Sequence, residues 1–186
     1  DVSEILALTA QQLTAALAAG GAAGILIGPG GAPIVEVEAP QRDRLPLALL
    51  ETPLLERLRE TQGLFSTADV AAEPDLGRLV ELYCQPRGAR ALLIVPLISG
   101  ASLFGWMMID RGEPSRFLPA ELELARTICN QAAAAIQNAR LFDETRSLTD
   151  STFIGNARKK SSRARTAMRS RTLAAHDRAR VMSPAS

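Results

Sequence analysis

One stretch decides the fold: residues 90–111 read RALLIVPLISGASLFGWMMIDR. Two apolar runs, Arg90–Ile98 and Leu103–Asp110, flank a short glycine-containing turn at Ser99–Ser102. Runs of this length and composition on either side of a tight turn predict two strands that pair antiparallel. Pro96 lacks a backbone N–H, which predicts an edge position or a bulge at that point of the first strand.

A second hairpin and a helix are predicted upstream. Gly24–Ile27 and Pro33–Glu38 are short apolar segments joined by a glycine-rich turn, which predicts a β-hairpin. Residues 3–19 predict a helix that begins with Ser3 as a candidate N-cap and ends at Gly20. The apolar face of this helix consists of Leu6, Ala10, Leu13 and Leu17.

The middle of the chain is predicted to form short elements. Residues 45–61 are typical of a short helical region, and Gly63–Thr67 of a short extended segment. Asp69–Pro74 is expected to be a loop, and Asp75–Tyr83 a second short helix.

The longest predicted helix runs from Pro119 to Leu148, about 45 Å at 1.5 Å per residue. Its apolar positions recur every three or four residues and cover a wider arc than packing on one sheet requires. This arc predicts a parallel homodimer through the terminal helices, with Ile136 as the main contact. The dimer and signalling positions expected on this helix are Leu124, Ile128, Ala132, Ala135, Ile136, Ala139, Phe142 and Leu148.

The distribution of charge divides the chain near Asp150. Residues 1–150 carry 12 arginines and no lysine against 19 acidic residues, whereas residues 151–186 carry nine basic residues and one acid. Ser, Arg and Ala dominate the end of the chain without an apolar period, which is typical of disorder. We therefore predict a folded domain over residues 1–148 and a basic, disordered tail over 149–186.

The composition of residues 1–150 excludes several kinds of site. The absence of His and Lys excludes imidazole catalysis, His-ligated metal or haem, and Schiff-base lysines. Two cysteines, Cys84 and Cys129, provide neither a disulfide framework nor a zinc site, and this usage fits a reducing cytoplasm. Residues 5–35 are uncharged, but Gln, Thr, Gly and Pro interrupt them, so we expect no membrane contact. We expect a cytoplasmic piece of a longer chain that holds no metal or cofactor.

Residues 90–146 resemble the GAF domain, a small-molecule sensing module of bacterial signalling proteins. The matching segments are LLIVPLI at 92–98, GWMMID at 105–110, FLPAEL at 117–122 and AAAIQNARLF at 133–142. The segment FSTADV at 65–70, followed by Asp75, is also similar to a loop of that family. Together the resemblance covers residues 3–148.

The resemblance implies an α+β, PAS-related fold. It would contain a six-stranded antiparallel sheet with the N- and C-terminal helices on one face and a ligand pocket, covered by loops and short helices, on the other. The candidate pocket residues are Asp69, Asp75, Tyr83, Cys84, Arg90, Ile94, Pro96, Trp106, Met108 and Asp110. Strand alternation sends Trp106 and Met107 to opposite faces, and the sequence leaves open which one faces the pocket. The charged residues Arg87, Arg90, Asp110 and Arg111 fit either solvated strand ends or the rim of the pocket.

The residues that bind particular ligands in known branches of the family are absent from this sequence. Residues 1–150 contain no Lys for the Asn-Lys-Phe-Asp-Glu motif of cyclic-nucleotide-binding members and no His for haem. In bilin-binding members a His usually follows the attachment Cys, whereas Gln85 follows Cys84. We therefore expect a colourless protein that binds neither cyclic GMP nor haem, and in which Cys84 is a half-buried thiol.

We expect a sensory, non-enzymatic domain whose ligand biases the long helix and, through it, a kinase- or cyclase-type output domain. One alternative is a thiol-dependent reductase of free methionine sulfoxide; that family branch needs a cysteine cluster, and only Cys84 is placed for it. The other is a ligand-responsive transcription regulator with its tail on DNA, but the tail has one aromatic residue, Phe153, and no helix-turn-helix spacing. The tail has two further interpretations besides DNA binding. Its opening weakly resembles the start of diguanylate cyclase domains, or the tail is an extension without a function of its own.

Overall fold

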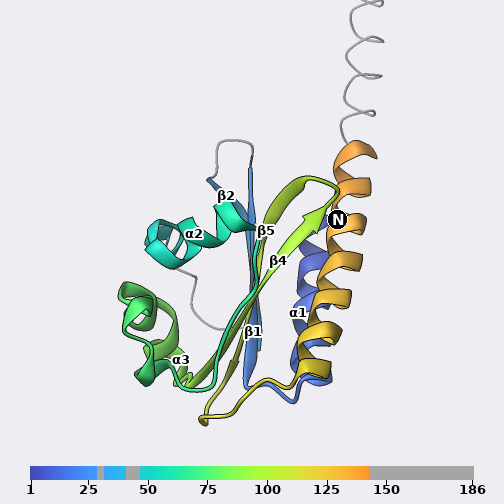
Figure 1. The fold of residues 1–186 in the computed structure, drawn as a ribbon. Coiled ribbons are helices and arrows are strands. Elements are labelled where there is room, and N and C mark those ends of the chain that lie inside the picture. Colours follow the sequence, from blue (N-terminus) through green and yellow to red (C-terminus); the bar gives the residue numbers. More distant parts are fainter. Residues whose placement is uncertain (29–31, 41–46, 143–186) are drawn as a thin grey trace, which may run out of the picture. The chain divides into compact units, whose positions relative to one another are not determined.

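One antiparallel sheet carries helices on both of its faces (Figure 1). The computed structural model describes residues 1–28, 32–40 and 47–142. The strands stand in the order β2-β1-β5-β4-β3, and every neighbouring pair is antiparallel. Their bounds are β1 (Gly21–Ile27), β2 (Pro33–Ala39), β3 (Phe65–Thr67), β4 (Ala91–Ser99) and β5 (Ser102–Arg111).

The six-stranded sheet implied by the resemblance is corrected to five strands within the described residues. All five coincide with the segments predicted from the residues themselves, namely the two hairpins and the short segment that became β3. Between β2 and β3, the described residues 47–61 are helical, because Leu54, Leu55 and Leu58 recur at helical spacing rather than in alternation.

The hairpin of β4 and β5 forms as predicted, with Val95 opposite Met107 and Pro96 opposite Trp106. The last pair of β3 with β4 is Phe65 with Ile94, so Pro96 lies past the end of β3. The register shifts between Leu97 and Ile98, which places an irregularity next to the proline as well. The edge position and the strand irregularity expected from Pro96 are therefore both present.

Gly105 is required where β5 leaves this irregularity. Its φ is +153°, and a Cβ added there would lie 1.9 Å from the carbonyl oxygen of Ile25 on β1. No side chain fits at that distance, so only glycine allows β5 to approach β1 here.

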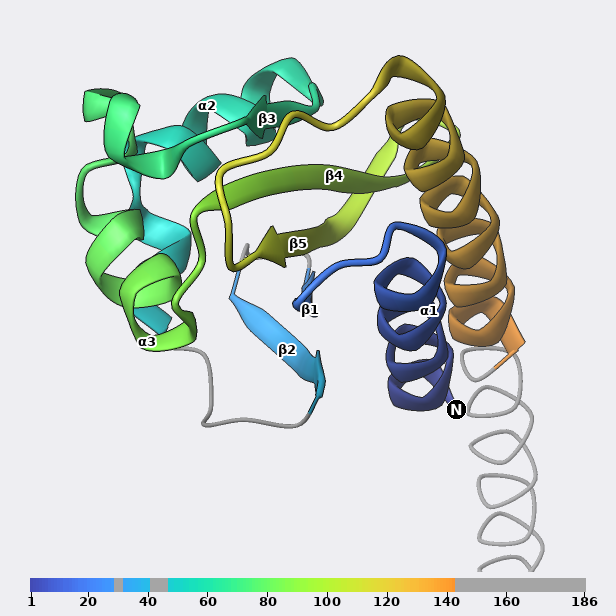
Figure 2. The same ribbon diagram turned by 90° about the horizontal axis from the view of Figure 1, so that it is seen from below.

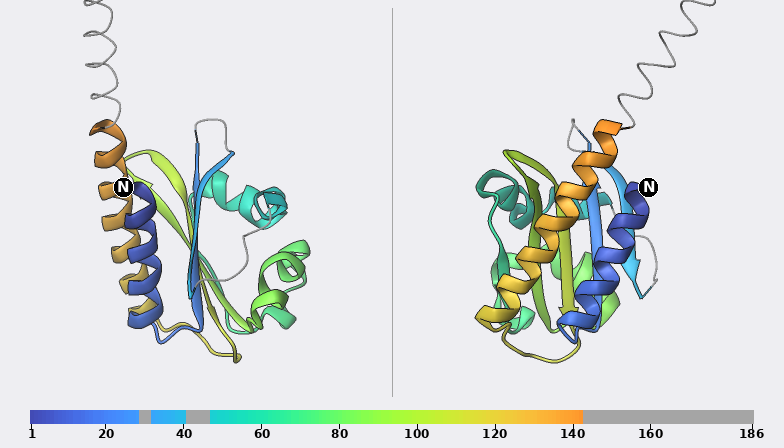
Figure 3. Two further views of the ribbon diagram at one scale, coloured as in Figure 1. Left: turned by 180° about the vertical axis from the view of Figure 1, so that it is seen from behind. Right: turned by 90° about the vertical axis from the view of Figure 1, so that its right-hand side faces the viewer.

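The terminal helices lie side by side on one face of the sheet, which we call the helix face (Figure 3). Helix α1 (Val2–Ala16) buries Leu6, Ala10 and Leu13 completely, as predicted, together with Leu17 just beyond it. The N-cap, however, is Asp1, whose carboxylate accepts the backbone N–H of Ser3. The expected Ser3 cap is therefore wrong by two residues, and the helix ends before Gly20.

The C-terminal helix is described over residues 119–142 and begins at Pro119 as predicted. Its sheet-facing side packs Ile128, Ala132 and Ile136 into the core of the same chain. Ile136 is 0% exposed, so the prediction that it is the main dimer contact is corrected: the side chain faces its own sheet.

Other positions predicted for the dimer are more accessible. Leu124 is 43% exposed, Ala135 and Ala139 are half-buried, and Phe142, in a second unit that begins at Leu141, is also exposed. Leu148 and the tail 149–186 lie outside the described residues, and the dimer itself stays a prediction. None of the helices within 1–28, 32–40 and 47–142 is long and apolar enough to cross a bilayer.

Short helical elements cover the opposite side of the sheet, which we call the insert face (Figure 2). Their bounds are η1 (Leu47–Glu51), α2 (Pro53–Thr61), η2 (Val70–Ala72), η3 (Pro74–Leu76), the π-helical turn η4 (Val80–Cys84) and α3 (Gln85–Arg87). A second hydrophobic cluster lies between them and the sheet. Trp106 and Met108 belong to this cluster and Met107 to that of the helix face, which decides the orientation that the sequence left open.

Candidate functional site

The insert face combines an apolar layer with several buried polar side chains. Of the ten residues predicted to line a pocket, seven are buried: Tyr83, Cys84, Ile94, Pro96, Trp106, Met108 and Asp110. The other three, Asp69, Asp75 and Arg90, lie nearer the surface. The structure adds Glu38 and Arg87 to the buried polar set.

Tyr83 and Asp110 form the centre of this polar set. The Tyr83 hydroxyl lies 3.0 Å from Oδ2 of Asp110, to which it donates, and 3.3 Å from the carbonyl oxygen of Met108. Both side chains are almost fully buried, and a carboxylate in such a place needs hydrogen-bond donors. The carboxylate of Asp110 also lies over the Gly20–Gly21 backbone, where an added Cβ would lie 3.4–3.5 Å from its oxygens. A methyl group at either glycine would therefore make only ordinary van der Waals contact with Asp110.

Arg87 connects Tyr83 to the edge of the sheet. Its guanidinium pairs with the carboxylate of Glu38 on β2, and the two side chains are only 6% and 8% exposed. The same guanidinium stacks 4.2 Å from the centre of the Tyr83 ring and donates to the carbonyl oxygen of Tyr83 at 3.3 Å. Burial lowers the pKa of Arg87, and the charge of Asp110 counteracts this effect. Glu38, Arg87, Tyr83 and Asp110 therefore form one polar chain from β2 to β5.

The two cysteines lie on opposite faces of the sheet. Cys84 belongs to the cluster of the insert face and Cys129 to that of the helix face. Burial raises the pKa of Cys84 to about 12, with a further contribution from the charge of Asp110, and burial raises the pKa of Cys129 to about 12. Because the thiolate is the reactive form, neither thiol is a ready nucleophile, and the intervening sheet separates them.

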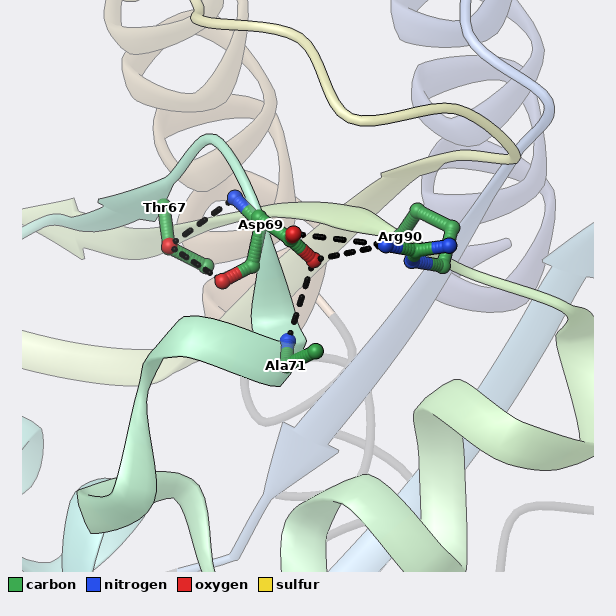
Figure 4. Close-up of polar contacts among 4 residues, drawn as sticks. All are labelled: Thr67, Asp69, Ala71 and Arg90. Atoms are coloured by element: carbon green, nitrogen blue, oxygen red, sulfur yellow. Dashed lines mark hydrogen bonds and ion pairs between the residues drawn. The ribbon is translucent and has the colours of Figure 1, made fainter.

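Asp69 and Arg90 form a separate, more exposed contact (Figure 4). One Nη of Arg90 lies 3.3 Å from each carboxylate oxygen of Asp69, which also accepts the backbone N–H of Ala71 and so caps η2. The hydroxyl of Thr67 contacts the backbone of Asp69 from the other side. This cluster fixes the connection after β3 to the start of β4, while Asp75 lies exposed on η3. Of the two interpretations that the sequence left open, the solvated strand end describes Arg90, whereas the side chains of Asp110 and Arg87 are buried.

The indole N–H of Trp106 is a further buried polar group on the insert face. Its ring is 0% exposed, and its indole N–H has no hydrogen-bond acceptor among the described residues. The guanidinium of Arg59 on α2 lies 5.8 Å from the ring centre, within the range of a cation–π contact.

Arg111 follows Asp110 and contacts both terminal helices. One Nη donates to the carbonyl oxygen of Leu17 at 2.7 Å and to Glu121 at 2.6 Å, and the guanidinium lies 4.3 Å from the centre of the Phe117 ring. The other carboxylate oxygen of Glu121 accepts the N–H of Leu118 at 2.7 Å and thereby caps the C-terminal helix. The Leu118 hydrogen bond, aided by Arg111 and opposed by burial, lowers the pKa of Glu121.

Glu38 and Arg59 were missed as site residues, although one signal pointed to Glu38. Val35 and Val37 occupy alternate positions of β2 and face the helices, so Glu36 and Glu38 must face the other side. Short helices cover that side, and an acid placed there becomes buried and requires a cation. In the described ranges no three His, Cys, Asp or Glu residues stand close enough together to hold a metal ion.

A family model described as the GAF domain matches residues 1–136, which include both hairpins, the insert and most of the C-terminal helix. The chain belongs to the GAF domain family. The sequence-based resemblance to this family is thereby confirmed. A search of curated protein sequences finds no match to this GAF domain.

Solved GAF domains have the same fold. The PixJ GAF domain of Thermosynechococcus elongatus, in its blue-light absorbing form, aligns with a TM-score of 0.62 at 16% identity, over 79% of this chain and 91% of that one. A GAF domain/HD domain protein of Geobacter sulfurreducens aligns with a TM-score of 0.63 at 20% identity, over 77% and 97%. A domain of a two-component sensor histidine kinase protein of Sinorhizobium meliloti aligns with a TM-score of 0.58 at 20% identity, over 78% and 97%. At these identities the likeness shows the fold alone.

Proposed function

We propose that this GAF domain is a non-enzymatic sensory module that acts in the cytoplasm and binds a small molecule on its insert face. The observation that carries the proposal is the polar chain of Glu38, Arg87, Tyr83 and Asp110 inside an otherwise apolar layer. Buried ion pairs often stabilise a fold less than apolar side chains of the same volume would. Stability alone therefore does not account for these groups, whereas recognition of a polar group on a ligand does.

The bound state would reach the rest of the molecule through β5. Trp106, Met108 and Asp110 face the insert, and Arg111, the next residue, binds Leu17 and Glu121 at the ends of the two helices. A ligand that prefers one position of this strand would shift the population of helix arrangements. The proposed recipient is a kinase- or cyclase-type output domain of the full protein.

The terminal helices would also form the homodimer interface, at positions revised by the structure. Leu8 on α1 and Leu124 on the C-terminal helix are both exposed, whereas Ile136 is buried in its own core. Sedimentation equilibrium across micromolar concentrations tests this part. We expect Leu124→Asp to weaken the dimer and leave the monomer folded, and a wild-type protein that stays monomeric throughout would exclude it.

Reductase chemistry receives no support from the geometry. A dithiol mechanism needs two thiols within reach of one another, and Cys84 and Cys129 lie on opposite faces of the sheet. We therefore keep the binding function and propose no reaction.

Native mass spectrometry of the purified protein tests for a retained small molecule. Tyr83→Phe removes one buried hydroxyl from the insert face and should lower the retained fraction several-fold. Thr9→Val is the matched control, because it removes a buried hydroxyl on the helix face that bonds only within α1, to the carbonyl of Ile5. Equal losses in both variants would contradict the assignment of the insert face. No retained molecule, together with no thermal shift from a metabolite library, would contradict the function.

A further inference from the structure

Among the described residues, the indole of Trp106 is a buried hydrogen-bond donor without an acceptor. It is the chain's one tryptophan, its ring is fully buried, and no described residue accepts its N–H. Buried tryptophans usually find a partner for this group, and leaving it unpaired destabilises the fold. The position therefore calls for an acceptor that comes from elsewhere.

The surroundings of Trp106 are poorly suited to a water molecule. Its partners in register are Ile25 on β1 and Pro96 on β4, and Met108 follows it on the same face. The α2 residues of the same cluster are Leu54, Leu55 and Leu58. A buried water needs two to four polar partners, whereas these side chains offer it none beyond the indole. An apolar molecule with one acceptor group matches this environment better.

Arg59 indicates the charge of that acceptor. Its guanidinium lies 5.8 Å from the centre of the Trp106 ring, and Arg59 itself is exposed on α2. A buried carboxylate must be paired, and a cation beside an N–H donor gives it a charge-assisted bond and a neutral one. A neutral acceptor would leave Arg59 without a role in recognition.

We propose that the insert face binds an apolar monocarboxylate at Trp106. The indole N–H donates to one carboxylate oxygen, Arg59 pairs with the charge, and the hydrocarbon body lies in the apolar layer between α2 and the sheet. This inference rests on the proposed small-molecule function and names the chemical class of its ligand. Arg59 and Trp106 are binding residues in this arrangement, and no reaction is involved.

The single tryptophan makes the test specific to one site. A ¹⁵N-labelled sample of the full chain shows one indole N–H signal, which moves downfield when the N–H gains an acceptor. Three probes with the same six-carbon chain are titrated: hexanoate, hexan-1-ol and hexylamine. We expect a saturable downfield shift with hexanoate, binding of hexan-1-ol weaker by about tenfold or more, and no shift with hexylamine.

Charge-matched variants separate Arg59 from the general charge of the protein. Arg59→Gln should weaken hexanoate binding about tenfold, and Arg57→Gln, an equal change at another exposed position of α2, should leave it unchanged. Trp106→Phe keeps a ring but removes the donor, and should abolish the thermal shift caused by hexanoate. If Trp106→Phe does not fold, the comparison of Arg59→Gln with Arg57→Gln still tests the proposal.

Several outcomes would overturn the inference without touching the proposed function. These are hexanoate binding that leaves the indole signal in place, equal effects of Arg57→Gln and Arg59→Gln, or equal affinity for hexan-1-ol. Failure of hexanoate to bind up to millimolar concentration would overturn it too, as would a retained molecule that lacks a carboxylate. The proposed function itself fails only when no small molecule of any class is retained or bound.

Discussion

The two faces of the sheet share every strand but contain different chemistry. On the helix face, α1 and the C-terminal helix pack aliphatic side chains and Cys129 against the strands, together with Phe104 of β5 and Phe117 before the C-terminal helix. On the insert face, a cluster of similar size surrounds Tyr83, Asp110 and Trp106 and meets the Glu38–Arg87 pair at its edge. Alternation along β5 alone separates Met107 and Ile109 from Trp106 and Met108. One strand can therefore contribute to an apolar core on one side and to the proposed ligand site on the other.

The comparison teaches where substitutions should separate folding from binding. A helix-face side chain contributes through volume and burial, so its loss destabilises the whole domain. A polar side chain on the insert face is replaceable at moderate cost to the fold, but its partner then loses a bond. Loss of ligand without loss of fold is thus expected on the insert face only.

The largest effect is expected where both faces depend on one backbone position. Gly105→Ala puts a methyl group 1.9 Å from the carbonyl oxygen of Ile25 at a φ that disfavours side chains, so β5 must separate from β1. We expect a loss of more than about 4 kcal/mol in urea unfolding, or no folded protein. Gly112→Ala is the control, because its nearest neighbour would be 3.8 Å away. Comparable stability of the two variants would contradict the described register of β1 and β5.

A buried charge on the helix face should have the next largest effect. Ile136→Asp leaves an unpaired carboxylate in the core and should cost about 3–5 kcal/mol, measured by urea unfolding. Leu124→Asp, on the same helix but 43% exposed, should cost less than about 1 kcal/mol. Were both variants equally stable, Ile136 would have to lie outside the core of its own chain.

How far the sequence predicts this molecule depends on the kind of pattern. Two continuous apolar runs on either side of a turn predicted β4 and β5 correctly, because both strands are buried on both faces, and the period-3.6 pattern predicted the buried side of α1. The same reasoning missed the role of Ile136, since an apolar helix arc does not say whether a sheet or a second copy covers it. It also left open whether Asp110 and Arg87 are solvated or rim a pocket, because burial of a strand end depends on the short helices that cover it. Glu38 stands on β2, 49 positions before Arg87, and a pair so distant in sequence has no local signature.

Each face contains one thiol, which allows a direct comparison by pH. The pKa of both Cys84 and Cys129 is raised to about 12, mainly by burial. The folded state thus holds its thiol protons longer than the unfolded chain, whose thiols have a pKa near 9. The resulting stability is complete below about pH 9 and is lost as the pH rises from there towards 12.

Urea unfolding at pH 8 and pH 10 measures this effect. We expect the free energy of unfolding to fall by about 1 kcal/mol per thiol between these values, and by less in Cys84→Ala and in Cys129→Ala. Ellman's reagent provides a second measurement, because neither thiol should react at pH 8 until the protein unfolds. Rapid modification of Cys84 in the folded protein would show that the insert face opens to solvent.

The smallest expected effect concerns a residue that belongs to neither face. Glu121 caps the C-terminal helix, and its lowered pKa means that its carboxylate stabilises the fold at neutral pH. Glu121→Gln should cost about 1 kcal/mol at pH 7. The difference should disappear as the pH falls through the lowered pKa of Glu121, where the wild-type carboxyl group becomes protonated. Melting temperatures of both proteins between pH 3 and 7 measure it, and a constant difference over that range would contradict the pKa shift.

Arg111 has a mechanical consequence that follows from its position. Its single guanidinium holds the carbonyl of Leu17 after α1 and the carboxylate of Glu121 at the start of the C-terminal helix. The two helices are therefore pinned at one shared pivot, and neither of these ends can slide along the sheet without pulling on the other. Arg111 directly follows Asp110 in β5. A small twist of that strand end would therefore turn the attached ends of both helices together.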